Sequence, residues 1–213
     1  MSRLGFVNWC VACMRIHWLV VLIVVALTCS SRAGGAGERT ASPDGKLIAF
    51  VKPTPDKLVD TASEVTEATE IWTSEPNGAN ARLWLRGKSA ENPEEALAGF
   101  AGLQFSPDGT KIYFLSLAWV TSGAVHVLDL RTGKEEFVCP GNSLEVIHEG
   151  EYKGDLMVRQ HRYFLGGGSF DWLWLLRPNG EEIGPIAADD EDDDGPESSF
   201  RKMYMPNSLT HRE

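Results

Sequence analysis

The sequence contains few cysteines, and only one of them lies beyond residue 33. Three of the four cysteines in the 213 residues fall within the first 33, which leaves Cys139 alone in the remainder. A single thiol cannot form an intramolecular disulfide, so we expect Cys139 to be a small buried side chain at a strand end. Cys10 and Cys13 have the C-x-x-C spacing of redox sites but lack the βα context that such a site needs. A disulfide scaffold or redox fold is therefore not expected.

Positive charge is also scarce. The formal net charge is −10, and the first 33 residues contain three arginines and no acidic residue. The remaining chain has 17 basic against 30 acidic residues, a formal charge of −13. A surface this acidic repels phosphate, which argues against a nucleic-acid partner.

The sequence patterns of common catalytic and metal sites are missing. Ser169 lies in Gly-Gly-Ser-Phe-Asp, without the second glycine or the strand-to-helix elbow of a hydrolase nucleophile. The acidic run at 189–194 lacks the spaced oxygen ligands of a calcium loop. No H-x-x-x-H pair or cysteine at metal spacing accompanies the later histidines, which are His126, His148, His161 and His211. We therefore predict no catalytic residue, no metal ligand and no cofactor.

One apolar run stands out, at residues 18–29, and it is about a dozen residues long. A spanning helix needs roughly 20 apolar residues. Basic residues precede the run and small residues follow it, which is the pattern of a secretory signal peptide over residues 1–33. The alternative is a short membrane anchor that stays attached. Because the run begins late, Met14 is a second candidate for the true start.

Two ways of processing this segment remain open. Ser31-Arg32-Ala33 has the small-x-small form of an ordinary cleavage site, whereas Ala26 to Ser30 resembles a lipoprotein box in which Cys29 would be lipidated. In both cases we expect an exported protein of the periplasm or cell envelope. Its membrane contact would be made only through the signal or through a lipid on Cys29.

An internal repeat organises the rest of the chain. Ser-Pro-Asp-Gly occurs at 42–45 and again at 106–109, each time before an apolar, β-rich run. Proline, aspartate and glycine each favour a tight turn. Further turns contain Gly78, Gly133 and Gly180, and their spacings are close to the roughly 40–50 residues of a propeller blade. Three units are therefore predicted.

The third unit departs from this pattern, because Lys153-Gly154-Asp155 stands where the Pro-Asp-Gly turn would be. Strands are predicted at 158–165 and 170–176, joined by a glycine-rich turn. Residues 53–70 are predicted to be a solvated loop, and residues 89–97 a short helical turn. No full helix is expected after the signal. Residues 189–213 are predicted to be an acidic, disordered tail.

The recurring Ser-Pro-Asp-Gly-x-x-Ile-x-Phe pattern, with Asp-Leu-x-x-Gly at 129–133, resembles the TolB-type (WD-like) β-propeller repeat. The stretch from Gln160 to Ile186 is similar to small exported bacterial proteins with TolB-like repeats, a similarity that implies no activity. The resemblance covers roughly residues 40–186, and we place the corresponding domain at residues 38–188. It implies an all-β fold of about three antiparallel four-stranded blades. Because closed propellers have 4–8 blades, a partial or open propeller is expected.

The leading hypothesis is a non-enzymatic protein-interaction module. Its partner would be an envelope protein, or a second copy that pairs through the open blade edge. The alternative is a small-ligand or glycan-binding protein, or a hydrolase, that uses loop and aromatic residues near 161–174. A shortened propeller that has lost its role is a third option. The candidate binding residues are His161, Tyr163, Asp171, Trp172 and Trp174.

Overall fold

The computed structural model describes residues 38–188 and 195–205. The predicted signal peptide, the alternative start at Met14 and the lipidation candidate Cys29 lie outside these residues. So do residues 189–194 and 206–213 of the predicted tail.

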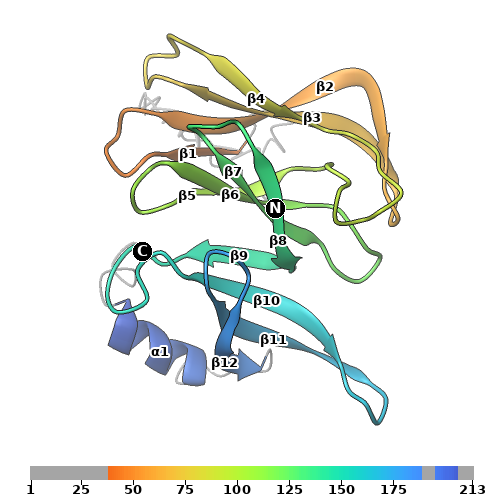
Figure 1. The fold of residues 1–213 in the computed structure, drawn as a ribbon, viewed down its shortest axis with the longest axis vertical. Coiled ribbons are helices and arrows are strands. Elements are labelled where there is room, and N and C mark those ends of the chain that lie inside the picture. The colour runs from red at the N-terminus through yellow and green to blue at the C-terminus, as the bar shows by residue number, and fades with distance from the viewer. Residues whose placement is uncertain (1–37, 189–194, 206–213) are drawn as a thin grey trace, which may run out of the picture. The chain divides into compact units, whose positions relative to one another are not determined.

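The described chain forms three four-stranded antiparallel sheets, each with its strands in sequence order (Figure 1). The first sheet contains β1 (Arg39–Ala41), β2 (Ile48–Asp60), β3 (Val65–Ser74) and β4 (Arg82–Arg86). The second contains β5 (Ala101–Phe105), β6 (Lys111–Ser116), β7 (Ala124–Asp129) and β8 (Glu135–Pro140). The third contains β9 (Ser143–Val146), β10 (Leu156–Tyr163), β11 (Ser169–Leu176) and β12 (Glu182–Ala188). This confirms the predicted all-β fold of three open, propeller-type blades.

The two Ser-Pro-Asp-Gly repeats form the same turn. In the first, the Ser42 hydroxyl donates to Asp44 Oδ1 at 2.7 Å and accepts the Leu47 amide at 2.9 Å. In the second, Ser106 donates to Asp108 at 2.6 Å and accepts the Lys111 amide at 3.0 Å. The turn glycines Gly45 and Gly109 have φ of 69° and 70°, a conformation that glycine adopts without steric cost.

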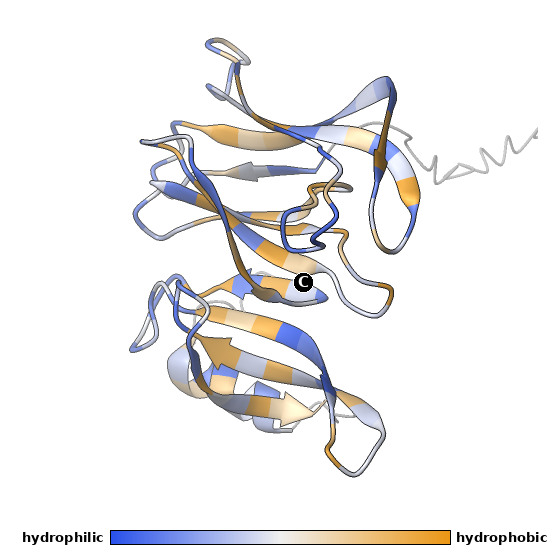
Figure 2. Cartoon of the chain, turned by 45° about the vertical axis from the view of Figure 1, so that its right-hand side comes forward, coloured by the Kyte–Doolittle hydropathy of each residue, from blue (hydrophilic) through white to orange (hydrophobic). Residues whose placement is uncertain are grey.

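Apolar and polar residues alternate along the strands, as the hydropathy colouring in Figure 2 shows. The buried apolar side chains fill the space between the sheets. The first core joins residues of the first sheet, such as Val51 and Ile71, to Ile112 and Phe114 of the second. The next core uses the other face of the second sheet and joins it to the third. Its buried residues include Tyr113, Val125, Val127, Leu144, Val146 and Val158.

Polar side chains link the first strands of successive sheets. Glu38 precedes β1, and its carboxylate accepts hydrogen bonds from the amides of Gly102 and Leu103 at 2.8 and 2.7 Å. The side chain of Gln104 on β5 donates to the Leu144 carbonyl at 2.6 Å and accepts the Val146 amide at 2.8 Å. The strands β1, β5 and β9 are therefore tied together by side chain to backbone bonds, in addition to core packing.

The face of the first sheet that points away from the second is covered by cations. Alternation places Phe50 and Trp72 on this face, opposite Val51 and Ile71. The guanidinium of Arg39 lies 5.2 Å from the centre of the Phe50 ring, and the Lys52 ammonium lies 4.3 Å from the Trp72 ring. These cation–π contacts keep a charged layer between the rings and solvent.

Within residues 195–205, the structure corrects the prediction of a disordered tail without a helix. Residues 196–204 form α1 (Pro196–Tyr204), which packs on the third sheet (Figure 1). Phe200 and Tyr204 are four residues apart and share one side of the helix, where they meet Tyr152. Pro196 begins the helix, a position that proline favours. The acidic run at 189–194, just before the helix, favoured the prediction of a disordered tail over that of a helix.

Residues 53–70 are also not a solvated loop. The strands β2 and β3 continue through this segment and remain paired as far as Asp60 and Val65, with a register shift between Thr54 and Leu58. Val59 and Ala68 are buried with Ala98 in a small apolar cluster, which holds the end of this hairpin in place. Residues 89–97 form turns, not a helical turn.

Candidate functional site

The predicted candidate residues all lie on the β10–β11 hairpin, but the hairpin divides them between its two faces. Gln160 pairs with Trp172 and His161 with Asp171, so successive residues point to opposite sides. His161, Tyr163 and Asp171 share the face that also carries Leu173, which packs in the cluster with α1. Trp172 and Trp174 lie on the other face. The five residues therefore do not converge on one site.

On the first face, His161 and Asp171 form a cross-strand pair. Nδ1 of His161 lies 2.6 Å from Asp171 Oδ1, and both side chains are partly exposed. The Tyr163 ring meets the His161 ring edge to face, with centroids 5.0 Å apart. The contacts of the pair resemble those of an acid–base dyad. Among the described residues, however, no nucleophile or oxyanion donor lies within hydrogen-bonding distance of it.

On the other face, the tryptophans are built into packing. Trp174 is partly buried against the core between the second and third sheets, and the Arg162 guanidinium lies 4.1 Å from its ring centre. Trp172 packs beside Phe170, with ring centroids 6.2 Å apart. Neither forms the exposed aromatic strip that a glycan site requires. The two-residue spacing of Trp172 and Trp174 predicts a shared face of the strand but not whether that face is exposed.

A pocket of about 400 Å³ lies between β8 and the third sheet, and of the predicted residues only His161 lines it. Its polar groups are already paired: Arg162 contacts Gln160 and Glu182, and Gln160 donates to the Pro140 carbonyl at 2.8 Å. Burial raises the pKa of Cys139 in its wall to about 12, which keeps this thiol protonated. The prediction that Cys139 is a buried strand-end residue is confirmed.

A group of exposed apolar residues lies at the tip of the same hairpin. Tyr163, Phe164 and Leu165 follow one another there; the first two are 71% and 52% exposed, and Leu165 is fully exposed. Val120 is 81% exposed, and the neighbouring Thr121 hydroxyl lies 3.2 Å from the Tyr163 hydroxyl. We call Val120, Tyr163, Phe164 and Leu165 the tip patch. The β10–β11 hairpin, whose tip carries Tyr163, Phe164 and Leu165, projects beyond the rest of the third sheet in Figures 1 and 2.

Sequence reasoning predicted the hairpin and the candidate Tyr163, but missed Val120, Phe164 and Leu165. The signal was present, because Phe164 and Leu165 stand directly before three glycines, a segment that offers no neighbouring side chain to cover them. Gly167 and Gly168 have φ of 91° and 87°, so the tip requires glycine there.

The predicted strand histidine His126 is fully buried in β7. Its Nδ1 lies 2.6 Å from Glu135 Oε1, and its ring stacks on Phe114, whereas Nε2 has no hydrogen-bond partner among the described residues. Within residues 38–188 and 195–205, no three histidine, cysteine or acidic side chains are grouped closely enough to hold a metal ion. In the same part of the chain, no helix combines the length and hydropathy needed to cross a membrane.

No family model matches the sequence, and no curated protein is similar to it. Solved structures do match, at low identity. The β-propeller domain of the Trilobed protease from Pyrococcus furiosus is 16% identical, with a TM-score of 0.44 over 73% of this chain and 43% of that one. A putative TolB from Agrobacterium tumefaciens is 16% identical, with a TM-score of 0.45 over 70% and 45%. A gluconolactonase from Xanthomonas campestris is 17% identical, with a TM-score of 0.44 over 74% and 50%.

The chain spans half the length or less of the three proteins. The assignment of the fold rests on the three sheets themselves.

Proposed function

We propose that this chain is a non-enzymatic, exported protein-interaction module that contacts its partner through the tip patch. The observation that carries the proposal is the exposure of Tyr163, Phe164 and Leu165 at the end of a projecting hairpin. Contiguous exposed apolar side chains are unfavourable in water and are typical of interaction sites. Export is inferred from the N-terminal sequence pattern alone.

The partner we propose is an envelope protein that offers an apolar groove to the hairpin tip. Phenylalanine and tyrosine are frequent anchors in such grooves, because they bury a large area with few rotatable bonds. Arg162 at the base of the tip is paired with Glu182, so it adds a polar rim without leaving an uncompensated charge. The alternative partner is a second copy of the chain that pairs through the open blade edge.

The glycan or small-ligand alternative is weaker on this hairpin. His161 and Asp171 lie on one face and Trp172 and Trp174 on the other, so they cannot contact one ligand together.

Site-specific photo-crosslinking in producing cells tests the proposal. Phe164 is replaced by p-benzoylphenylalanine, and the control carries the same residue in place of Asn77, at an exposed polar turn of the first sheet. We expect a discrete heavier adduct from position 164, absent from position 77, that identifies one envelope protein. Equal adducts from both positions, or none from either, would contradict a role for the tip patch.

A further inference from the structure

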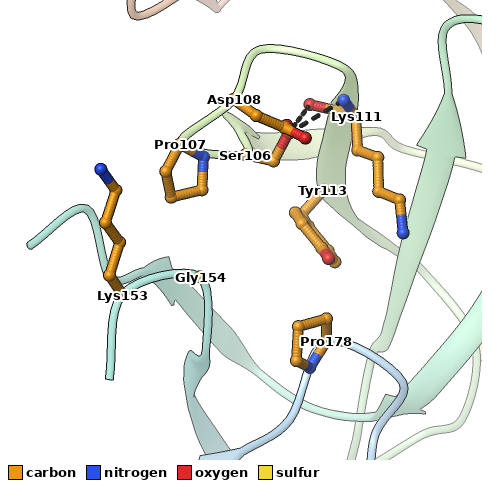
Figure 3. A pocket seen from close by; sticks show the side chains of 8 residues that line it. All are labelled: Ser106, Pro107, Asp108, Lys111, Tyr113, Lys153, Gly154 and Pro178. Atoms are coloured by element: carbon orange, nitrogen blue, oxygen red, sulfur yellow. Dashed lines mark hydrogen bonds between the residues drawn. The ribbon is translucent and has the colours of Figure 1, made fainter. Parts of the chain in front are cut away.

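A second hollow lies at the turn ends of the second and third sheets, away from the tip patch (Figure 3). It has a volume of about 370 Å³, and we call it the turn pocket. Three turns meet there: the second Ser-Pro-Asp-Gly turn, the turn before β10 and the turn between β11 and β12. The lining residues are Ser106, Pro107, Asp108, Lys111, Tyr113, Lys153, Gly154 and Pro178.

Tyr113 supplies a polar group with no partner. The residue is only 1% exposed, and its ring is part of the core between the second and third sheets. Its hydroxyl makes no hydrogen bond to any residue that the structure describes, and Figure 3 shows the oxygen directed into the open space beside Pro178. The hydroxyl oxygen opens into the pocket, where it is available to donate to a ligand.

The Tyr113 hydroxyl is a donor at every physiological pH. Burial, with smaller effects from Asp108 and Asp155, raises the pKa of Tyr113 to about 12. A group that stays protonated can donate to an anion but does not carry a charge of its own. The hydroxyl therefore suits an anionic oxygen.

Two lysines line the same pocket; in Figure 3 the Lys111 side chain runs beside Tyr113, whereas the Lys153 ammonium points away from it at the other side of the lining. Lys111 and Lys153 take part in none of the ion pairs formed among the described residues. Asp108 is the one acidic side chain in the lining, and its carboxylate already accepts from the Ser106 and Thr110 hydroxyls. The lining therefore carries one net positive charge, on a chain that is otherwise strongly acidic.

The first repeat provides an internal comparison. The position of Tyr113 is occupied there by Ala49, which has no hydroxyl, and Lys46 in the place of Thr110 pairs with Asp44 at 3.2 Å. The same turn therefore has neither a free donor nor an unpaired cation in the first sheet. The features of the turn pocket do not follow from the turn motif itself.

The geometry points to the turn pocket as a binding site for a small organic carboxylate with an apolar body. One net positive charge fits a monoanion better than a phosphate dianion. The rings of Pro107 and Pro178 offer apolar walls to the body, while Tyr113 donates to the carboxylate, Lys111 beside it supplies the nearer positive charge, and Lys153 adds to the charge of the lining. This site is separate from the tip patch, so either proposal can fail without the other.

Titration of the full chain with benzoate, followed by backbone amide NMR shifts, tests the inference. Benzyl alcohol serves as the uncharged probe of the same shape. We expect benzoate to shift amides of residues 106–113 and 153–154 with a dissociation constant on the order of 1 mM, as suits a ligand this small. Benzyl alcohol should bind at least tenfold more weakly, because it lacks the charge.

Two variants and a control locate the site. Tyr113→Phe removes only an unbonded hydroxyl, so it should fold normally and weaken benzoate about fivefold to tenfold. Lys111→Gln should weaken it several-fold, whereas the exposed Lys134→Gln, whose lysine pairs with Glu136, should have no effect. Equal binding of benzyl alcohol, unchanged binding to Tyr113→Phe, or no saturable shifts in these segments would overturn the inference.

Discussion

Arg201 on α1 and Glu145 on β9 form a two-pronged ion pair across 56 residues of sequence. Nη1 and Nη2 of Arg201 lie 2.8 and 2.7 Å from the two carboxylate oxygens of Glu145, and Nε donates to Glu197 at 2.8 Å. The Arg201 side chain is mostly buried. Its hydrogen bonds to Glu145 are the largest cause that raises the pKa of Arg201 above the usual range. This pair fixes α1 against the outward face of the third sheet, where a propeller would place its next blade.

Replacement of Arg201 should loosen α1. In Arg201→Leu, Glu145 loses its ion pair while partly buried and Glu197 keeps its contact with Arg159, and we expect the free energy of unfolding to fall by about 2 kcal/mol. Amide exchange should rise across residues 196–204 more than in β10. The control is Met203→Gln on the same helix, at a side chain that is 68% exposed, which should change little. Similar losses in both variants would show that Arg201 does not hold the helix in place.

Gly78 and Gly180 occupy the same Pro-Asn-Gly turn in two sheets, with φ of 85° and 86°. A Cβ at Gly78 would meet no atom within 4 Å, whereas one at Gly180 would lie 2.3 Å from the Val138 carbonyl oxygen on β8. Gly78→Ala should cost about 1 kcal/mol of strain, and Gly180→Ala should cost at least about 2 kcal/mol more as the sheets separate. Chemical denaturation measures both. Equal costs would mean that this contact between the second and third sheets is not tight.

The turn aspartates predict a loss of stability in acid. The Ser42 hydroxyl, with the Lys46 amide, lowers the pKa of Asp44 from 3.8 to about 2, and the Thr132 amide, with the Arg131 side chain, does the same for Asp129. Because the folded pKa values lie below the unfolded ones, the stabilisation is present above about pH 4 and is lost as the pH falls to about 2.

The variant Asp44→Asn with Asp129→Asn should therefore show a weaker dependence of the free energy of unfolding on pH between these values. The pKa of Asp155 is raised by burial, which acts in the opposite direction, but this group is common to both proteins and cancels in the comparison. An unchanged pH profile in the double variant would contradict the assignment to these turns.

Gln104 should contribute to stability through hydrogen bonds that hydrophobic packing cannot replace. In Gln104→Leu, the Leu144 carbonyl and Val146 amide lose their side-chain partners, and we expect a loss of about 1–3 kcal/mol measured by thermal unfolding. Thr132→Val, at an exposed turn, is the comparison and should have a small effect.

The repeats made most of the fold predictable, because turn chemistry is local. Ser42 to Phe50 and Ser106 to Phe114 contain their own turn hydrogen bonds, and their strands follow directly from the apolar alternation. The helix α1 was not predictable in this way. Its stability depends on Glu145 and Tyr152, which are distant in sequence, and the nine residues of α1 are too few to form a stable helix alone.

The site was harder to predict than the fold. The sequence places His161, Asp171 and Trp172 within a few residues of a glycine turn, but only the cross-strand register decides which of them share a face. Tyr113 was overlooked because an aromatic in a strand is ordinarily a core residue. Its ring is indeed in the core, and only the approach of Lys153 and Pro178 from the third sheet makes its hydroxyl part of a pocket.

The central structural claim is that one chain closes the outward face of its third sheet with α1 and leaves the tip patch for a different protein. Light scattering on residues 34–213, beside the same chain ending at residue 194, tests it most directly. We predict a monomer for the longer chain and self-association for the shorter one, whose exposed residues would include Met157, Leu173 and Leu175. A stable dimer of the longer chain, unchanged by removal of α1, would contradict the account.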